Sequence, residues 1–326
     1  MGDLGELEYQ LLESCSKKNT TDIKKLLNNL QININCQSCY GWTPLYTACF
    51  YGHIDVVKLL LNDERIIVFE DKEGNGKAEN NFNQTPLFAA CEKGHNDIVK
   101  LLLNDNRVDI NHVDTHGRTS LWIACVHGHF KIVKLLLNDE KIDINKAKLS
   151  GETPLHIAFQ NGHIDIVKLL FNDKRVDLNK SNNLSVSPFY YACEKGYIDI
   201  VKLLLNDEKV NVNKVNVHDQ SPLYVACENG HVKIVKLLVN DDRVDVNKAE
   251  VGGKTPLYIA CWKGYSQIVK LLLNNPRVSI RNKTKKGKTS IEIVNEMNQL
   301  EIVKLIQEVD TGNFNDFNKS KITLLI

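Results

Sequence analysis

One motif returns at a nearly fixed interval along most of this chain, and it constrains the fold more than any other feature of the sequence. The motif is clearest over residues 255–270, which read TPLYIACWKGYSQIVK. Its opening Thr or Ser recurs at positions 43, 85, 119, 153, 187, 221, 255 and 289. The first interval is 42 residues long and the next six are 34 residues long. A fixed period of this length predicts a repeat protein in which each unit packs on its neighbours.

Each unit has the features of two short helices separated by a glycine. In the first full unit, Thr43 can cap a helix with its hydroxyl, and Pro44 suits the first helical position because no amide donor is needed there. Gly52 can take the left-handed conformation that ends a helix, and a second apolar helix is expected over residues 55–61. Asn62 can end that helix in the same conformation. One such pair is too small to bury its apolar faces, so stacked pairs are expected to share a continuous core.

These residues resemble the ankyrin repeat family, whose pattern is roughly G-x-TPLH-x-AA-x-x-GH-x-x-I-V-x-LLL followed by a turn and D-V-N. Residues 151–179, GETPLHIAFQNGHIDIVKLLFNDKRVDLN, match this pattern closely, and the resemblance covers about residues 4–309. It implies an all-α fold, namely an ankyrin-repeat solenoid of stacked antiparallel helix pairs joined by hairpin-like loops, right-handed and curved.

Two features depart from the family pattern. The usual period is about 33 residues. The extra residue of each link, within an Asn-Asp-x-Arg-Val segment, is expected at the hairpin turn. The family's His after Thr-Pro-Leu is usually replaced by an aromatic residue and is kept only at position 156.

The repeat predicts one elongated domain over residues 1–310 instead of two globular domains. Residues 4–38 are expected to form an N-terminal cap and residues 285–310 a C-terminal cap, with residues 311–326 as a short, flexible tail. Between the caps, the predicted full repeats are residues 39–80, 81–114, 115–148, 149–182, 183–216, 217–250 and 251–284.

The register of the repeat also predicts which side chains are buried. In the central unit, Leu155, Ala158 and Leu169 are expected to lie in the core. In the last unit, Glu292 stands in the aromatic column and Asn295 in the Cys column. Polar residues in these two columns are typical of a closing cap that no further unit covers.

Charge and cysteine content limit the partners and the compartment. The formal net charge is +1, so the chain as a whole has no strong attraction to nucleic acid or to an anionic membrane. Neither a secretory signal nor a membrane-spanning stretch is expected. The nine cysteines favour the reducing cytoplasm over a disulfide framework, because six of them occupy one packed column. These six are Cys49, Cys91, Cys125, Cys193, Cys227 and Cys261.

Two segments resemble ligand-binding loops but fail at a required position. Residues 287–289 read Gly-Lys-Thr, like the end of a phosphate-binding loop, yet Asn282 stands where that loop needs Gly. Residues 71–76 resemble the start of a calcium loop, yet its twelfth position is Phe82, which has no carboxylate. A solvent-exposed insertion is the favoured interpretation of the second segment.

No metal, cofactor or catalytic site is predicted. Cys36 and Cys39 form one CxxC pair, to which Cys15 and His53 are conceivable additions, but zinc sites need two suitably spaced pairs. The His that follows the helix-ending Gly recurs at repeat spacing, so we interpret it as a packing or capping device. Because no nucleophile, base and orienting group stand in a unique arrangement, the chain is predicted not to be an enzyme.

Residues that vary between units are the candidates for binding. The family resemblance places the hairpin tips and the surface of the first helices on a concave binding face. The first full unit carries four aromatic residues expected to be exposed there, and aromatic residues dominate binding hot spots. The alternative is that Tyr40 and Trp42 pack on the N-terminal cap and the long insertion. The predicted partner-binding residues are Tyr40, Trp42, Phe50, Tyr51, Phe82, His116, Arg118, His127, Trp262 and Lys263.

The sequence therefore favours a monomeric, non-catalytic scaffold or adaptor that binds a partner protein in the concave groove. No small-molecule substrate, cofactor or membrane is expected. One alternative is a regulatory inhibitor that occludes a partner enzyme. Another is a reader of an acidic partner or nucleic acid at the C-terminal end, since residues 277–288 contain six basic residues and no acidic one.

Overall fold

The structure, a computed structural model, describes residues 5–68 and 78–310. It divides into two compact units, each made of several repeats: the first unit is Met1–Asp177 and the second unit is Leu178–Ile326. Each unit is described by itself. The described residues form eighteen helices in nine pairs and contain no strand, which confirms the predicted all-α repeat solenoid. The calcium-like segment 71–76 and the tail 311–326 lie outside the described residues.

The first unit contains five helix pairs: α1 (Glu6–Ser16) with α2 (Thr20–Leu27), α3 (Pro44–Tyr51) with α4 (Ile54–Leu61), α5 (Pro86–Lys93) with α6 (Asn96–Leu103), α7 (Ser120–Val126) with α8 (Phe130–Leu137), and α9 (Pro154–Gln160) with α10 (Ile164–Phe171). The second unit contains four: α11 (Pro188–Lys195) with α12 (Ile198–Leu205), α13 (Pro222–Glu228) with α14 (Val232–Val239), α15 (Pro256–Lys263) with α16 (Ser266–Leu273), and α17 (Ser290–Glu296) with α18 (Leu300–Asp310).

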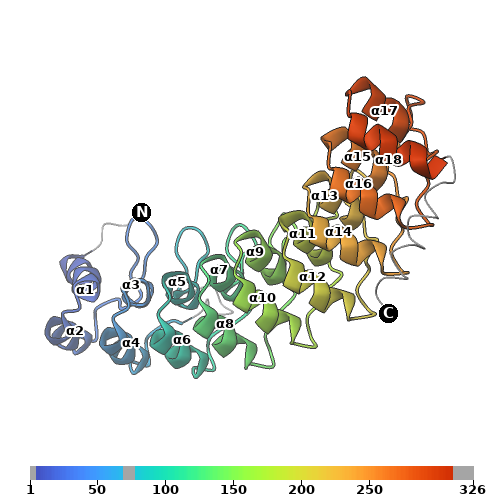
Figure 1. The fold of residues 1–326 in the computed structure, drawn as a ribbon. Helices are drawn as coiled ribbons and strands as arrows, with labels where there is room; N and C mark the ends of the chain where they lie inside the picture. Colours follow the sequence, from blue (N-terminus) through green and yellow to red (C-terminus); the bar gives the residue numbers. More distant parts are fainter. Residues whose placement is uncertain (1–4, 69–77, 311–326) are drawn as a thin grey trace. The chain divides into compact units, whose positions relative to one another are not determined.

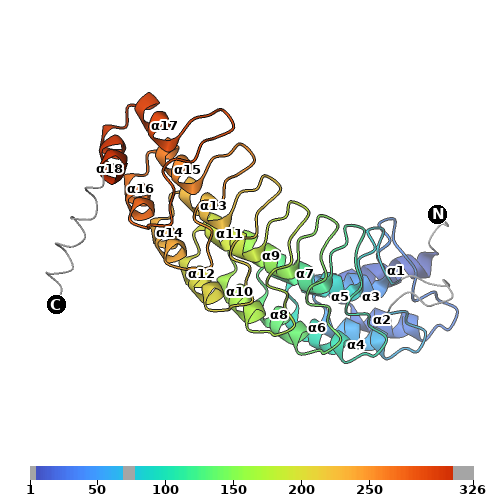
Figure 2. The same ribbon diagram turned by 90° about the vertical axis from the view of Figure 1, so that its right-hand side faces the viewer.

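Each unit consists of two layers of helices. The odd-numbered helices pack side by side in one row and the even-numbered helices in a second row alongside it, as Figure 1 shows within each unit. The links between pairs extend beyond the odd-numbered row as hairpin-like loops (Figure 2). The first helices and these loops therefore lie at one side of each unit.

Local capping residues determine where the first helices begin and end. The hydroxyl of Thr43 accepts a hydrogen bond from the Tyr46 backbone N–H, and the same bond starts every later odd-numbered helix. Gly52 follows α3 with φ 78°, the left-handed conformation expected of it. The expectation for Asn62 is wrong, because its φ of −77° and ψ of −10° keep it right-handed at the end of α4.

The core is made by most residues of the first helices of the full repeats, such as Pro44 to Cys49 of α3, and by one stripe of each second helix. Leu155 and Ala158 of α9 are buried as predicted. In α10, the buried side chains are Ile166, Val167 and Leu170. The prediction for Leu169 is wrong. Leu169 comes one residue before Leu170 on the helix, so its side chain points to one side of the buried stripe and is only half-buried.

The links contain two separate turns. The Asn-Asp-x-Arg-Val segment, or its Lys variant, forms a turn directly after the second helix, as in residues 138–142, where Ile142 N–H donates to the Asp139 carbonyl at 3.3 Å. The hairpin turn follows at residues 148–151, closed by Gly151 N–H and the Lys148 carbonyl at 2.8 Å. The placement of this segment at the hairpin turn is therefore wrong.

Side chains of the links join consecutive repeats. Asn145 donates from Nδ2 to the Arg175 carbonyl at 2.7 Å and accepts the Asp177 N–H at 2.8 Å. The guanidinium of Arg175 donates to the carbonyls of Leu137 and Asp139, at 2.7 and 3.1 Å. The asparagine bonds recur from Asn35, Asn111, Asn179, Asn213 and Asn247, and equivalent arginine bonds from Arg65, Arg107, Arg243 and Arg277.

The recurring His is a structural residue, as the sequence indicates. His95 donates from Nε2 to the Phe50 carbonyl at 3.0 Å, and His129 bonds the Glu92 carbonyl at 3.1 Å in the same way. The imidazole of His95 lies directly against Gly52, where a Cβ atom would meet it at about 2.5 Å. The glycine thus leaves room for the imidazole of the next repeat, and this bond fixes the end of α3.

Candidate protein-binding surface

An aromatic cluster lies on α3 of the first unit. Tyr46 and Phe50 are four residues apart on α3, so their side chains share one face of the helix, and Trp42 lies just before the helix begins. The ring of Trp42 lies 4.7 Å from that of Phe50, 5.3 Å from that of Tyr46 and 6.3 Å from that of Tyr51. Tyr46 is buried beneath the cluster, and its hydroxyl accepts a hydrogen bond from Asn80 Nδ2 at 3.1 Å. The buried Tyr46 therefore supports the other rings of the cluster.

The aromatic cluster is less exposed than the sequence predicts at two of its positions. Tyr51 is exposed, whereas Trp42 and Phe50 are half-buried because they cover each other and Tyr46. Trp42 precedes α3, and its ring contacts the rings of three residues of that helix, Tyr46, Phe50 and Tyr51. Trp42 consequently presents part of its ring at the surface of the first helix.

A lysine from the next repeat completes the aromatic cluster. Lys93, the last residue of α5, places its ammonium 4.4 Å from the centre of the Phe50 ring. It also forms an ion pair with Glu92 at 3.4 Å. An ammonium over an aromatic face is an attractive cation–π contact. The surface thus combines exposed aromatic area with one cation and one carboxylate.

The hairpin tips beside the aromatic cluster carry exposed apolar side chains. Tyr40 is 68% exposed at one tip and Phe82 is 57% exposed at the next. Backbone hydrogen bonds join successive tips, from Asn81 N–H to the Tyr40 carbonyl at 3.2 Å and from Thr115 N–H to the Phe82 carbonyl at 3.0 Å. His116 is exposed at the third tip.

Leu149, 74% exposed at the fourth tip of the first unit, is absent from the predicted set. Its N–H donates to the His116 carbonyl at 3.0 Å, which places it in line with the preceding tips. Its position just before the turn residues Ser150 and Gly151 could have identified it, because apolar residues at such turns are solvent-exposed.

The guanidinium of Arg118 is held by contacts within the protein. Its guanidinium forms an ion pair with the buried carboxylate of Asp114 at 2.6 Å and lies 5.5 Å from the centre of the Phe88 ring. Trp122, only 5% exposed, donates from Nε1 to the Glu152 carbonyl at 3.1 Å. Arg118 thus contacts Asp114 and Phe88 of the preceding repeat and lies 6.0 Å from the ring centre of Trp122 in its own repeat.

His127 lies at the C-terminal end of α7, where its exposed ring stacks on His129 at 5.8 Å. Partial desolvation is the main cause that holds its pKa below the usual value for histidine. The nearby Glu92 acts in the opposite direction, whereas His129 and Lys93 lower the pKa further. The ring is accordingly neutral at neutral pH.

The second unit carries its own aromatic residue with cations. Trp262 is 41% exposed on α15, and the ammonium groups of Lys263 and Lys254 lie 5.2 and 5.6 Å from its ring centre. Near α11 and α13, a hollow of about 430 Å³ is lined by hairpin and first-helix residues that include Leu184, Val217 and His218. None of these three is in the predicted set, although Leu184 and Val217 are among the exposed apolar residues of the tips.

The described residues contain no group of three or more His, Cys, Asp and Glu side chains that could hold a metal ion. The six column cysteines are buried, and burial raises the pKa of each thiol well above its usual value. Within the same residues, no helix is long and apolar enough to cross a membrane.

Comparison with known proteins agrees with this geometry. A family model described as "Ankyrin repeats (3 copies)" matches residues 9–70, 67–148, 143–216 and 210–284. The chain belongs to the ankyrin repeat family. Ankyrin repeats are protein–protein interaction modules and are typically non-catalytic, so this chain carries such a module.

Curated relatives match only a short part of this ankyrin repeat protein. Oxysterol-binding protein-related protein 1 of Homo sapiens is 40% identical over an alignment of 65 residues that covers 17% of this chain and 7% of the relative. The proteins of the same name from Rattus norvegicus and Mus musculus are each 38% identical over 65 residues, with the same coverage. The match thus spans a small fraction of these relatives.

Proposed function

We propose that this protein is a scaffold or adaptor that binds a partner protein through an interaction surface on its first unit. The interaction surface comprises Tyr40, Trp42, Phe50, Tyr51 and Phe82. The observation that supports it most is the aromatic cluster, in which Trp42, Phe50 and Tyr51 meet at the surface with Lys93 over the Phe50 ring.

Preorganisation of the aromatic side chains supports this function. Aromatic side chains offer a large contact area, and they lose little conformational freedom on binding when the free protein already holds them in place. The buried Tyr46 and the His95 bond to the Phe50 carbonyl hold this cluster before any partner arrives. Tyr40 and Phe82 extend the apolar area along neighbouring tips. A partner that covers these residues buries aromatic surface at low entropic cost.

His116, Arg118 and His127 are proposed to border the interaction surface, with Trp262 and Lys263 as a further contact site on the second unit. Arg118 is the weakest of these candidates, since Asp114 already holds its guanidinium. In the proposed arrangement the whole of residues 1–310 is one monomeric repeat domain. Nine cysteines without a disulfide fit a reducing compartment, and we propose the cytoplasm.

Affinity capture with the full chain tests the proposal. Partners are identified by mass spectrometry with the wild type, with Trp42→Ala, and with Tyr9→Ala as a matched control. Tyr9 is an exposed aromatic residue of α1 outside the interaction surface. We expect a partner that the wild type and Tyr9→Ala retain and Trp42→Ala loses. A partner retained equally by all three would contradict the assignment of the surface. For a captured enzyme, unchanged activity indicates an adaptor and lost activity an inhibitor.

A further inference from the structure

Arginine side chains join most of the links to the repeat before them. The guanidinium of Arg175 donates to the carbonyls of Leu137 and Asp139, at 2.7 and 3.1 Å. It also donates to both carboxylate oxygens of Asp173 in its own link, at 3.0 and 2.7 Å. Arg65 forms the same bonds with the carbonyls 38 and 36 residues earlier and with the aspartate two residues before it. One guanidinium thus satisfies two carbonyls and one carboxylate.

Lys141 takes the place of this arginine in the link after α8. Its backbone is held as in the arginine links, because its N–H donates to Asp139 Oδ1 at 2.9 Å and its carbonyl accepts a hydrogen bond from Asn111 at 2.8 Å. Its ammonium forms neither a hydrogen bond nor an ion pair with a residue that the structure describes. The carbonyls 38 and 36 residues earlier, those of Leu103 and Asp105, therefore receive no guanidinium from the described residues.

Three acceptors at this position lack the donor that the arginine links provide. Nothing in the described part of the chain donates to the Leu103 carbonyl. The Asp105 carbonyl accepts the Val108 N–H at 3.1 Å, which uses one of its two lone pairs. The carboxylate of Asp139 accepts the Lys141 N–H at Oδ1, whereas Oδ2 has no donor among the described residues. These groups are the counterparts of those that one guanidinium satisfies in the arginine links.

A hollow of about 550 Å³ lies beside these acceptors, between α6 and α8. Leu103 and Asp139, which carry two of the acceptors, line it together with Lys141. Leu135 of α8 adds an aliphatic side chain to the lining, and Asn138, also part of the lining, is exposed. A side chain from another molecule therefore has access to the position that an arginine of this chain fills in other links.

A guanidinium suits these acceptors better than an ammonium. Its planar fork carries five N–H donors that can reach carbonyls and a carboxylate together, whereas an ammonium is compact and strongly hydrated. Net charge does not select the ligand, because Lys100 and Lys141 balance Asp139 and Glu140 in the lining. Recognition at this position thus depends on the arrangement of the acceptors.

A further guanidinium is compatible with the array, since Arg243 and Arg277 occupy this column in two consecutive links of the second unit. Lys209 is the other lysine of the column. The repeat before Lys209 belongs to the first unit, so the position of Lys141 is the one that lies within a single unit.

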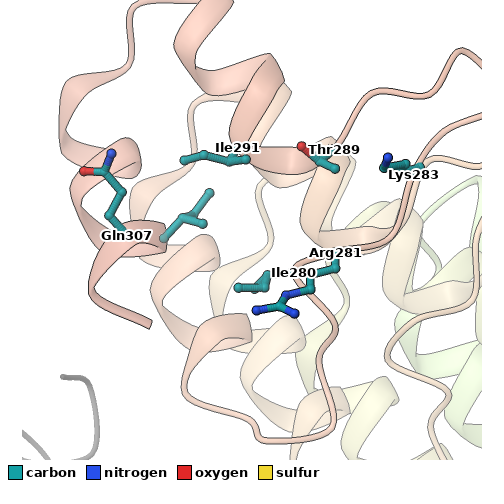
Figure 3. A pocket seen from close by; sticks show the side chains of 7 residues that line it. Ile280, Arg281, Lys283, Thr289, Ile291 and Gln307 are labelled. Atoms are coloured by element: carbon teal, nitrogen blue, oxygen red, sulfur yellow. The ribbon is translucent and has the colours of Figure 1, made fainter. Parts of the chain in front are cut away.

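The pocket of about 270 Å³ at the last helix pair gives no comparable indication of an occupant. Ile280 and Ile291 line it (Figure 3), and it lies where the described repeats end. No later described repeat shows which group packs on these two side chains. For the hollow beside Lys141, in contrast, Arg175 and Arg65 show the group directly.

We propose that the hollow beside Lys141 binds an arginine side chain of a partner protein. The guanidinium donates to the carbonyls of Leu103 and Asp105 and to the carboxylate of Asp139. The aliphatic part of the arginine lies against Leu135. A protein is the fitting source of this group, because the chain carries a protein–protein interaction module. The site shares no residue with the interaction surface of the first unit and does not depend on it.

Methyl NMR of the full chain tests the proposal, with acetyl-Ala-Arg-Ala-amide as the probe. We expect saturable shifts of the Leu103 and Leu135 methyl signals. The same peptide with lysine should bind about tenfold more weakly or worse, because an ammonium cannot reach all three acceptors. Lys141→Arg should also weaken probe binding about tenfold or more, because its own guanidinium then takes the acceptors.

Two variants are the controls for the change at position 141. Lys141→Gln removes the lysine without offering a guanidinium, so it should bind the probe at least as well as the wild type. Lys236→Arg adds a guanidinium at an exposed position of α14 in the second unit and should bind like the wild type.

Several results would overturn the proposal. Equal binding of the lysine peptide would mean that only positive charge is recognised. Undiminished binding by Lys141→Arg, or an equal loss with Lys141→Gln, would mean that the three acceptors do not hold the guanidinium. Tighter binding of free arginine than of the probe would make the hollow a small-molecule site. The absence of shifts at Leu103 and Leu135 would place the ligand elsewhere.

Discussion

At the scale of single residues, the same few side chains appear at each repeat because each forms a bond to the repeat before or after it. Asn145, Arg175 and His95 all bond backbone groups of a neighbouring repeat. These polar side chains satisfy backbone groups that the short helices leave without intrahelical partners. Residues that vary between repeats, such as Trp42 and Tyr51, are the candidates for partner binding.

Thiol reactivity tests the predicted burial residue by residue. Cys39 is exposed and the other eight cysteines are buried. Burial is the main cause that raises the pKa of Cys36 to about 12, and it raises the pKa of the column thiols as well. Because the thiolate is the reactive form, iodoacetamide at pH 8 should modify about one thiol per folded chain quickly. Mass spectrometry after short labelling should find the label at Cys39.

The Cys39→Ser variant is the control for this labelling and should lose the fast reaction. Rapid modification of several column cysteines in the folded protein would contradict the core described for α3, α5 and the later first helices.

The hydrogen bonds of the link asparagines give a second residue-scale prediction. Asn145→Ala removes two bonds between repeats and leaves the Asp177 N–H without its partner, so it should lower the free energy of unfolding by about 1–3 kcal/mol. Asn138→Ala, at the end of α8, is the matched control and should change it by less than about 0.5 kcal/mol. Urea unfolding measures both, and equal effects would remove the special role of the link asparagine.

At the scale of the helix pair, stability comes mainly from the buried residues of the first helix, which in α9 are residues 154–159. Leu155 of α9 is 3% exposed, so Leu155→Ala should lower the free energy of unfolding by about 2–5 kcal/mol. Leu149→Ala provides the same change of side chain at an exposed tip and should cost less than about 0.5 kcal/mol. A loss below about 1 kcal/mol for Leu155→Ala in thermal or urea unfolding would place the packed face elsewhere.

The sequence predicts helix pairs well because their signals are local. Thr43 and Gly52 each act within one turn of the helix that they bound, so their roles can be read without knowledge of the fold. Leu169 illustrates where this stops: in the run 169–170 both residues are apolar, and only packing against the neighbouring helix decides that Leu170 is the buried one.

The sequence predicts only the part of the candidate surface whose exposure follows from a local signal. Tyr40 and Phe82 lie at turns, and their exposure follows from the turn alone. The partial burial of Trp42 and the position of Lys93 over Phe50 depend on contacts across the helix and between repeats. Arg175 likewise finds its acceptors 36 and 38 residues earlier in the chain, a relation that no local pattern indicates.

At the scale of the whole molecule, contacts between repeats run mainly between neighbours, so a local defect should stay local. Hydrogen exchange on Leu155→Ala should show faster exchange in α7–α10 than in the wild type. Exchange in α15 and α16 should change much less, because these helices belong to the second unit. Equal acceleration throughout the chain would indicate a single cooperative unit.

The affinity of the captured partner is the most direct test of the proposed function. Isothermal titration with the wild type, Trp42→Ala and Tyr9→Ala compares an aromatic residue inside the interaction surface with one outside it, at a temperature at which all three are folded. The account predicts that Trp42→Ala weakens binding by 2 kcal/mol or more, about thirtyfold, and that Tyr9→Ala leaves affinity unchanged. Unchanged affinity of Trp42→Ala together with a lowered melting temperature would contradict it, because Trp42 would then serve only the packing of α3.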